Sequence, residues 1–367
     1  MTGDHMTGDH MRGETVLVTG ATGFIGGRLA EKLILEQGAA VRALVRTFAG
    51  ASRLARFKLE VIPGGVDDEE AVDRAVRDCK VVFHCAHDWH DEQRNLDGAR
   101  ILAEACRRHG VRRLVHVSSV SVYEPLRDGE LDESSPAEPC GWSYPDTKLA
   151  VERLLLRFGQ EHGVPVTVIQ PTIVYGPFSR PWTLAPAMGL RHGRVVLPTR
   201  DGLCNHVYVD DVVDALVAAA QTEAAVGERF LISGPDPVPW RAFYAAYEQM
   251  LGVQSVIRMS DAQLAKLTGA AGGAASKVRL LSRDPRRFGT WPSVQRLYSF
   301  VDESFIERVT RLLPPALHVP DEQRLALLRA RVTVKIDKAR RLLGYEPAFD
   351  FERGMSLTAK YVKWARL

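Results

Sequence analysis

A glycine-rich segment joins a short apolar run to an amphipathic stretch near the beginning of this chain, and few folds accommodate that combination. Residues 16–18, Val-Leu-Val, read as a buried strand, and residues 24–37 carry apolar side chains at helical spacing. Gly20, Gly23 and Gly26 would allow a tight turn, a close backbone approach to a pyrophosphate and close helix–sheet packing. Because a helix N-terminus also favours an anion, the segment predicts the phosphate-binding turn of a dinucleotide-binding domain.

Short apolar segments alternate with longer helical patterns through the first half of the chain. The apolar segments are residues 16–18, 41–45, 81–83, 114–117 and 166–169, and clear helical patterns cover residues 24–37 and 95–109. Apolar strands separated by helices of this length indicate a parallel sheet that is covered on both faces. The predicted fold class is α/β, a doubly wound, Rossmann-like parallel sheet, with a smaller, mostly helical C-terminal substrate lobe.

The chain divides into three predicted parts. Residues 1–12, which repeat the polar sequence MTGDH, are expected to form a flexible leader. Residues 13–170 form the dinucleotide-binding domain, and residues 171–367 form the substrate-binding lobe, with some chain near residues 205–235 returning to the first domain. The alternation of strand and helix patterns ends after Pro171, where several prolines follow. A Gly/Ala-rich stretch at residues 269–276 predicts a hinge within the lobe.

Composition indicates which cellular compartment and which class of binding partner to expect. The 48 basic and 45 acidic residues give a net charge of +3, which predicts no long-range attraction to nucleic acid or to an anionic membrane. No apolar run reaches the roughly 18–20 residues of a membrane span, and the polar N-terminus carries no secretion signal. The five cysteines form no CxxC pair, which is typical of a reducing compartment. We therefore expect a cytoplasmic protein that acts on a small-molecule substrate.

Three weaker patterns have plainer explanations. Residues 294–313 are amphipathic and would suit a membrane surface or a partner, but a lobe helix packed on its own domain is the favoured interpretation. The basic residues at 283, 286 and 287 are interpreted as a solvated face, because nucleic-acid binding needs many more contacts. His84, His87 and His90 resemble a set of metal ligands, but no predicted helix places them on one face, so we expect no metal site.

The residue at the end of the second predicted strand bears on which dinucleotide is bound. An Asp or Glu there would accept hydrogen bonds from an unphosphorylated ribose and repel a 2′-phosphate, whereas this chain has Arg46, twenty residues beyond Gly26. A guanidinium holds a phosphate through two hydrogen bonds. The position therefore favours NADP(H), and NAD(H), bound without help from this arginine, is the alternative.

Tyr144 and Lys148 lie four residues apart at the start of a predicted helix, so both lie on one helical face. A nearby ammonium stabilises a phenolate and lowers a phenol pKa that starts at about 10, which makes a tyrosine usable for proton transfer. Ser118 and Ser119 follow the strand at residues 114–117, where a hydroxyl can hold a substrate oxygen. With the glycine turn, the pattern predicts an acid–base site at the carboxyl edge of the sheet.

These motifs, in this order, resemble those of the extended short-chain dehydrogenase/reductases, the NAD-dependent epimerase/dehydratase-like superfamily. The resemblance covers residues 15–214, with a weaker match at residues 338–347. It implies a homodimer, a catalytic triad of Ser119, Tyr144 and Lys148, and an active-site asparagine at Asn95. Together with Arg46, the implied cofactor site comprises Gly20, Thr22, Gly23, Phe24, Ile25, Gly26, Val66, Asp67, Cys85, Ala86, Lys148, Pro171 and Ile173.

Departures from the family pattern narrow the chemistry. Dehydratases of the superfamily carry an Asp-Glu pair just after the catalytic hydroxyl, where this chain has Val120 and Ser121. Nucleotide-sugar epimerases usually carry an arginine that contacts the pyrophosphate, and that place is Cys204 here. Gln170 stands where many relatives have another arginine. Fewer cations near the substrate suit a less charged substrate.

The combined interpretation is an NAD(P)-dependent oxidoreductase that transfers hydride between nicotinamide and a carbonyl/alcohol substrate. It is similar to the dihydroflavonol-reductase-like and hydroxysteroid-dehydrogenase-like members of the superfamily. A nucleotide-sugar or other sugar epimerase with retained NAD is the alternative. A redox-silent sensing protein on the same fold is disfavoured, because such proteins typically lose the pair that this chain retains as Tyr144 and Lys148.

Overall fold

The computed structural model describes residues 11–47, 51–269 and 316–367, and within these ranges the main sheet has seven strands, all parallel. The strand order reverses between β1 (Thr15–Thr19) and β4 (Val81–His84), and in sheets of this kind ligands bind at that point, outside the carboxyl ends of the strands. In spatial order the strands are β12 (Arg229–Ile232), β7 (Val166–Pro171), β5 (Arg113–Val117), β4 (Val81–His84), β1 (Thr15–Thr19), β2 (Ala40–Val45) and β3 (Glu60–Pro63).

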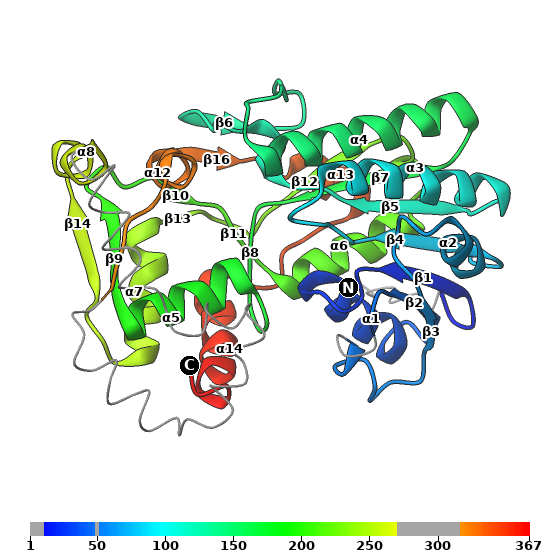
Figure 1. Ribbon diagram of the computed structural model, residues 1–367, viewed down its shortest axis with the longest axis horizontal. Helices are drawn as coiled ribbons and strands as arrows, with labels where there is room; N and C mark the ends of the chain where they lie inside the picture. Colours follow the sequence, from blue (N-terminus) through cyan, green and yellow to red (C-terminus); the bar gives the residue numbers. More distant parts are fainter. Residues whose placement is uncertain (1–10, 48–50, 270–315) are drawn as a thin grey trace, which may run out of the picture.

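Helices cover both faces of this sheet (Figure 1). Alternate residues of β1 supply the two cores: Val16 and Val18 pack with the helices on one face, whereas Leu17 packs with the helices on the other. The strand is buried on both sides because a parallel sheet is covered on each face. One face carries α1 (Phe24–Leu35) and α6 (Val209–Gln221), and the other carries α2 (Glu69–Val76), α3 (Glu92–Arg108) and α4 (Ser143–His162).

A second region, formed mainly by the chain after β7, lies beside the main domain (Figure 1). It contains a three-stranded parallel sheet in the order β14 (Val256–Met259), β9 (Gly193–Pro198) and β15 (Ala316–His318). Strands β10 (Leu203–Cys204) and β13 (Val238–Pro239) pair antiparallel. The helical elements of this region are η3 (Arg180–Leu184), α5 (Ala185–His192), α7 (Trp240–Leu251), α8 (Asp261–Gly269), α12 (Glu322–Arg329) and α14 (Phe351–Trp364).

Short ladders tie the two regions together. Strand β8 (Ile173–Tyr175) pairs with β11 (His206–Tyr208), and β6 (Gly129–Leu131) pairs with β16 (Val332–Val334), both parallel. The β6–β16 ladder brings the end of the chain back beside the segment that follows β5. The remaining short elements are η2 (Val120–Tyr123), η4 (Glu223–Ala225) and α13 (Asp337–Leu343).

The predicted fold class is confirmed, because a doubly wound parallel sheet carries a smaller region at its side. The three strands of the lobe were not predicted, since β9, β14 and β15 are short and lie among residues with helical spacing. The division of the chain at residue 170 stays a prediction. Strand β12 brings residues 229–232 back to the edge of the main sheet, beside β7.

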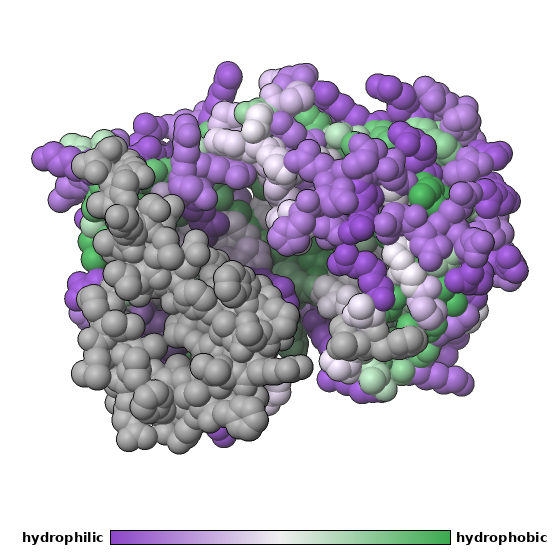
Figure 2. Space-filling model, in the orientation of Figure 1, coloured by the Kyte–Doolittle hydropathy of each residue, from purple (hydrophilic) through white to green (hydrophobic). Residues whose placement is uncertain are grey.

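Several predictions concern segments that lie outside the described residues. These are residues 1–10 of the leader, most of the hinge at 269–276, the amphipathic stretch 294–313 and the basic residues at 283, 286 and 287. Met11, within the predicted leader, is buried in the core. Throughout the described part of the chain, no helix combines the length and the apolar character that crossing a membrane requires. The surface over α2, α3 and α4 is mostly hydrophilic (Figure 2). The cytoplasmic location and the homodimer stay predictions.

Candidate active site

The glycine turn after β1 has the tight geometry that its sequence predicts. Gly20 has a φ of +68°, and a Cβ atom there would lie 2.7 Å from the amide nitrogen of Ala86 and 2.8 Å from the carbonyl oxygen of Cys85. A Cβ atom at Gly26 would lie 2.4 Å from the carbonyl oxygen of Gly20. Contacts this short with backbone atoms leave no room for a side chain at either position. The turn therefore packs directly against the segment that follows β4.

The start of α1 fits the pyrophosphate of a dinucleotide. Gly23 is the N-cap and has no side chain to hydrogen-bond the first turn, which also contains no acidic residue. The first amide groups of a helix lack intrahelical partners, and the helix dipole favours an anion at this end. Thr22 and Gly23 are exposed, and Phe24 and Ile25 are partly exposed, so a ligand can reach the backbone here. The residues present therefore suit the cofactor that the sequence implies.

A series of ion pairs links charged side chains in the segments that follow β2, β3 and β4. Arg46 directly follows β2, its side chain is 65% exposed, and its guanidinium contacts the Asp88 carboxylate at 3.0 Å. Arg94 contacts Asp88 at 3.2 Å and Asp67 at 2.9 Å. Because one nitrogen of Arg46 makes this ion pair and most of the side chain faces solvent, the guanidinium is accessible to a phosphate group.

The other predicted cofactor residues lie at the same carboxyl edge of the sheet. Val66 follows β3 and packs closely on α3, where a Cβ atom at Gly98 would lie only 2.6 Å from Cγ2 of Val66. Contact of these residues with a cofactor stays a prediction. The rest of the set directly follows or ends a strand: Cys85 and Ala86 come after β4, Pro171 ends β7 and Ile173 begins β8.

The structure brings Ser119, Tyr144 and Lys148 to the carboxyl end of β5. Ser119 is the N-cap of η2, where its hydroxyl oxygen accepts a hydrogen bond from the amide of Ser121 at 3.1 Å. Tyr144 lies in the first turn of α4, and its phenol lies close enough to the Ser119 hydroxyl for that hydroxyl to lower the phenol pKa. Lys148, one turn further along α4, is buried, and its ammonium donates a hydrogen bond to the carbonyl oxygen of Val117 at 2.9 Å.

Burial changes the proton affinity of both ionisable groups. Desolvation raises the pKa of Tyr144 to about 12, although the neighbouring Ser119 hydroxyl opposes the rise. Desolvation also lowers the pKa of Lys148 to about 8, because it disfavours the charged ammonium. The expectation that Lys148 lowers the pKa of Tyr144 is wrong for this structure, since burial dominates and the ammonium is bound to Val117. A phenol that is neutral near pH 7 is suited to donate a proton.

Asn95 holds the loop between β4 and α3. Its side-chain oxygen accepts a hydrogen bond from the amide of Asp88 at 2.8 Å, and its side-chain nitrogen donates to the carbonyl oxygens of Asp88 and Asp91 at 2.8 and 2.9 Å. The side chain is buried, and it lines a small cavity together with Lys148. Asn95 therefore shapes the loop, and its part in catalysis stays a prediction.

The histidines at the end of β4 have different surroundings from one another. His84 is buried, a hydrogen bond of 2.9 Å joins its Nδ1 to the Thr19 hydroxyl, and desolvation lowers its pKa to about 3. His87 packs edge-on against Tyr144, with ring centroids 5.1 Å apart. Within residues 11–47, 51–269 and 316–367, no group of three or more His, Cys, Asp or Glu side chains is arranged to hold a metal ion.

Two side chains near the phenol were not singled out from the sequence. Trp89 is 66% exposed and stacks on Tyr144, with ring centroids 4.7 Å apart and ring planes inclined by 15°. Glu124 accepts a hydrogen bond from Gln323 of α12 at 2.8 Å, and its charge contributes to the raised pKa of Tyr144. Neither residue belongs to a motif. The available signal is that each lies in a segment following a central strand, where active-site loops begin.

Positions 170 and 204, where this chain lacks an arginine that relatives carry, are both buried in the structure. Gln170 is buried, donates hydrogen bonds to Glu152 and accepts one from Tyr123, so it acts inside the domain and makes no direct contribution to the substrate surface. Cys204 is also buried, and the charge of Arg324 opposes the rise in thiol pKa that burial causes. Arg324 of α12 therefore supplies a positive charge close to Cys204, the position at which nucleotide-sugar epimerases usually carry an arginine.

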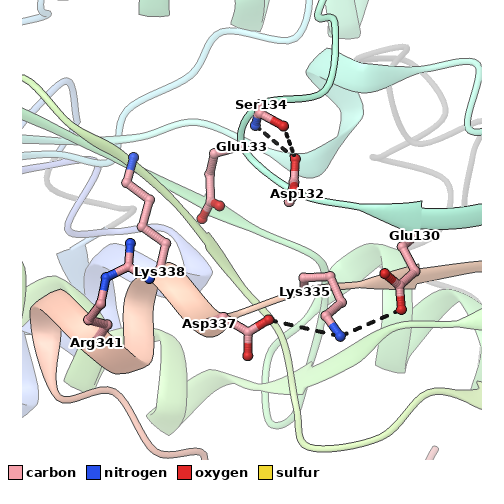
Figure 3. A pocket seen from close by; sticks show the side chains of 8 residues that line it. All are labelled: Glu130, Asp132, Glu133, Ser134, Lys335, Asp337, Lys338 and Arg341. Carbon is pink, nitrogen blue, oxygen red and sulfur yellow. Dashed lines mark hydrogen bonds and ion pairs between the residues drawn. The ribbon is translucent and has the colours of Figure 1, made fainter.

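A larger hollow lies between β6 and α13, apart from the triad (Figure 3). Lys335 pairs with two carboxylates of the hollow, 3.6 Å from Glu130 and 3.9 Å from Asp337, whereas Lys338 contacts Glu228, which lies outside the lining, at 2.6 Å. None of the predicted site residues lines it. The lining residues are Glu130, Asp132, Glu133, Ser134, Lys335, Asp337, Lys338 and Arg341.

Comparison with protein families agrees with this geometry. The NAD dependent epimerase/dehydratase family matches residues 16–233, a region that contains the glycine turn, Ser119, Tyr144 and Lys148. The chain belongs to this family. Membership confirms the resemblance to the extended short-chain dehydrogenase/reductases and places the protein among NAD-dependent enzymes.

Individual relatives include two reductases and a solved epimerase. The chain is 31% identical over 253 residues to a dihydroflavonol 4-reductase of Zea mays, covering 60% of this chain and 70% of that protein. It is 26% identical over 357 residues to the 4-hydroxy-2-methyl-3-oxo-4-farnesyl-3,4-dihydroquinoline-1-oxide ketoreductase of Stigmatella aurantiaca, covering 92% and 93%. An epimerase from Methanothermobacter thermautotrophicus shares the fold with a TM-score of 0.74 at 18% identity, covering 100% of this chain and 97% of the other.

Proposed function

We propose that this protein is an NAD(P)-dependent oxidoreductase that interconverts a ketone and the corresponding alcohol, with NADP(H) as the preferred cofactor. The observation that carries the proposal is that the side chains of Ser119, Tyr144 and buried Lys148 come together at the carboxyl end of β5, on the same sheet edge as the glycine turn. When bound, the nicotinamide supplies or accepts the hydride. The names of two relatives, a dihydroflavonol 4-reductase and a ketoreductase, support a carbonyl substrate.

The chain's own side chains handle the substrate oxygen and its proton. Ser119 and Tyr144 present adjacent hydroxyls, and both can hydrogen-bond one carbonyl oxygen. Because the phenol of Tyr144 is protonated near neutral pH, it can donate the proton that the oxygen takes up as the carbonyl becomes an alcohol. Lys148, one helical turn away, is buried at the same sheet edge, where its ammonium donates a hydrogen bond to the carbonyl oxygen of Val117.

Arg46 supports the preference for NADP(H). The end of β2 carries this cation in place of an acidic residue, and its exposed guanidinium is suited to a 2′-phosphate. Asp88 already pairs with Arg46 at 3.0 Å, so a phosphate competes with one carboxylate for the same cation. We therefore expect a moderate preference for NADP(H) over NAD(H).

Tyr144→Phe tests the assignment directly. Removing the proton donor should lower turnover of a ketone panel by about 10²- to 10⁴-fold, the usual contribution of general acid catalysis, while NADPH binding stays unchanged. The assay follows NADPH oxidation, and a fluorescence titration measures NADPH affinity. Tyr361→Phe, on the distant helix α14, is the matched control and should retain wild-type turnover. Turnover of Tyr144→Phe above about a tenth of the wild-type rate would overturn the assignment.

A sugar epimerase with retained NAD is the second candidate. The observation that favours it is Arg324 of α12, whose guanidinium lies 3.8 Å from the ring centroid of Trp182 and whose charge acts on buried Cys204, because a cation in this region suits the pyrophosphate of a nucleotide sugar. Mass spectrometry of the nucleotide released from denatured protein separates the two. Weakly held NADP(H) is expected for the oxidoreductase, whereas tightly retained, stoichiometric NAD would favour the epimerase.

A further inference from the structure

Two arginines from different segments of the chain meet at a single carboxylate oxygen. Arg46 directly follows β2, and Arg94 lies in the first turn of α3. The Nη1 atom of each guanidinium contacts Oδ2 of Asp88, at 3.0 Å for Arg46 and at 3.2 Å for Arg94. Because both nitrogens lie within hydrogen-bond distance of one oxygen atom, one small anion can contact both guanidiniums at the same time.

Other contacts hold the side chain of Arg94 in this orientation. Its Nε atom donates a hydrogen bond to Oδ2 of Asp67 at 2.9 Å, and its backbone amide donates one to the Asp91 carboxylate at 2.9 Å. The side chain is 39% exposed, so an anion can reach the guanidinium from solvent. A guanidinium that is ordered in advance loses less conformational entropy when it binds an anion.

Asp88 can release both arginines without losing its own place. Its Oδ1 atom accepts a hydrogen bond from the His90 amide at 3.0 Å, and its backbone is bonded on both sides of the peptide plane by the Asn95 side chain. These bonds do not involve Oδ2, the atom that contacts the arginines. A phosphate monoester carries nearly two negative charges and three acceptor oxygens, so it is a stronger partner for two guanidiniums than one carboxylate oxygen.

We propose that Arg94 is a second determinant of the preference for NADP(H), acting together with Arg46 on the 2′-phosphate, and that Asp88 competes with this phosphate for both arginines. The inference rests on the proposed preference for NADP(H) and adds two residues to it. The sequence indicated Arg46 alone for this phosphate. Strand β1 lies between β2 and β4, so the contact between Arg46 and Asp88 joins the segments on either side of the strand that leads into the glycine turn.

Isothermal titration calorimetry of nucleotide-free protein tests Arg94 without relying on turnover. NADP⁺ and NAD⁺ differ only in the 2′-phosphate, so the ratio of their Kd values isolates contacts with that group. Arg94→Ala should raise the Kd for NADP⁺ by roughly 5- to 20-fold and the Kd for NAD⁺ by less than about 2-fold. Arg100→Ala removes another cation of α3, which pairs with Asp97 at 3.3 Å, and should leave both Kd values unchanged. An unchanged ratio in Arg94→Ala, including an equal rise in both Kd values, would overturn the role of Arg94.

Asp88→Asn tests the competition in the opposite direction. The variant removes the negative charge and keeps the backbone bonds to Asn95, so the Kd for NADP⁺ should fall by roughly 3- to 10-fold and the Kd for NAD⁺ should change by less than about 2-fold. Asp97→Asn, which neutralises another carboxylate of α3, is the matched control and should change neither Kd. An unchanged or higher Kd for NADP⁺ in Asp88→Asn would overturn the competition.

The inference and the proposed function fail separately. Equal affinity of the wild-type protein for NADP⁺ and NAD⁺ would remove the proposed cofactor preference, and this inference with it. A clear preference for NADP⁺ that persists in Arg94→Ala would remove only the inference. The proposed ketone reduction is tested independently by the turnover of Tyr144→Phe.

Discussion

Gly20→Ala separates two reasons why the first turn needs a glycine. The φ of Gly20 is +68°, and a Cβ atom would lie 2.7 Å from the Ala86 amide nitrogen and 2.8 Å from the Cys85 carbonyl oxygen. The left-handed conformation costs a residue with a Cβ about 1–2 kcal/mol. Overpacking against these backbone atoms adds roughly 1–3 kcal/mol. The expected loss in the free energy of unfolding is therefore about 2–5 kcal/mol.

Gly110→Ala is the matched control, because Gly110 has a φ of +60° but no atom within 4 Å of an added Cβ. It should cost the conformational part alone, about 1–2 kcal/mol. Urea denaturation followed by circular dichroism measures both losses. Gly20→Ala should also weaken NADPH binding, since it displaces the segment at Cys85 and Ala86, whereas Gly110→Ala should not. Equal losses of stability, within about 0.5 kcal/mol, would refute the close packing of the turn against that segment.

Three further outcomes are expected. Arg46→Glu should weaken NADPH binding by roughly 10- to 100-fold and NADH binding much less, because it replaces a charge-assisted contact with repulsion; an unchanged ratio of the two affinities in fluorescence titrations would contradict this. Burial raises the pKa of Asp211 to about 7, although the amides of Ala348 and Phe349 oppose the rise. The folded protein therefore holds this proton more tightly than the unfolded chain, so the contribution of Asp211 to stability is full below about pH 4 and is lost as the pH rises through about 7. Asp211→Asn should flatten urea stability between about pH 5 and 8, and an identical slope would contradict the assignment. Asn95→Ala should lower the free energy of unfolding by about 1–3 kcal/mol, because it leaves the backbone groups of Asp88 and Asp91 without their side-chain partner; unchanged stability in urea denaturation would show that Asn95 does not hold the loop.

Local spacing was sufficient for features whose physical cause is local. Three glycines between a strand and a helix predict the turn, because the backbone conformation and the helix N-terminus depend on adjacent residues. The spacing of Tyr144 and Lys148 places them on one helical face for the same reason. The alternation of apolar strands with helices predicts a parallel sheet covered on both faces, and the fold confirms it.

Residues whose behaviour depends on distant segments were harder to interpret. Gln170 was expected to affect the substrate, but it is turned into the domain, where it bonds Glu152 and Tyr123. The short strands of the lobe escaped notice because β9 pairs with β14 and β15, which lie far along the chain. Pairing over such distances leaves little periodic signal in a strand of a few residues.

The sequence by itself determined the glycine turn after β1, the alternation of apolar strands and helices in the first half of the chain, and the place of Tyr144 and Lys148 on one helix, because each follows from contacts between near neighbours. Tertiary structure decided how those residues behave. Burial raises the pKa of Tyr144, which Lys148 alone was expected to lower, and the loop held by Asn95 stacks Trp89 on that phenol. Desolvation and ring stacking depend on which segments pack together, and spacing along one segment does not encode that packing.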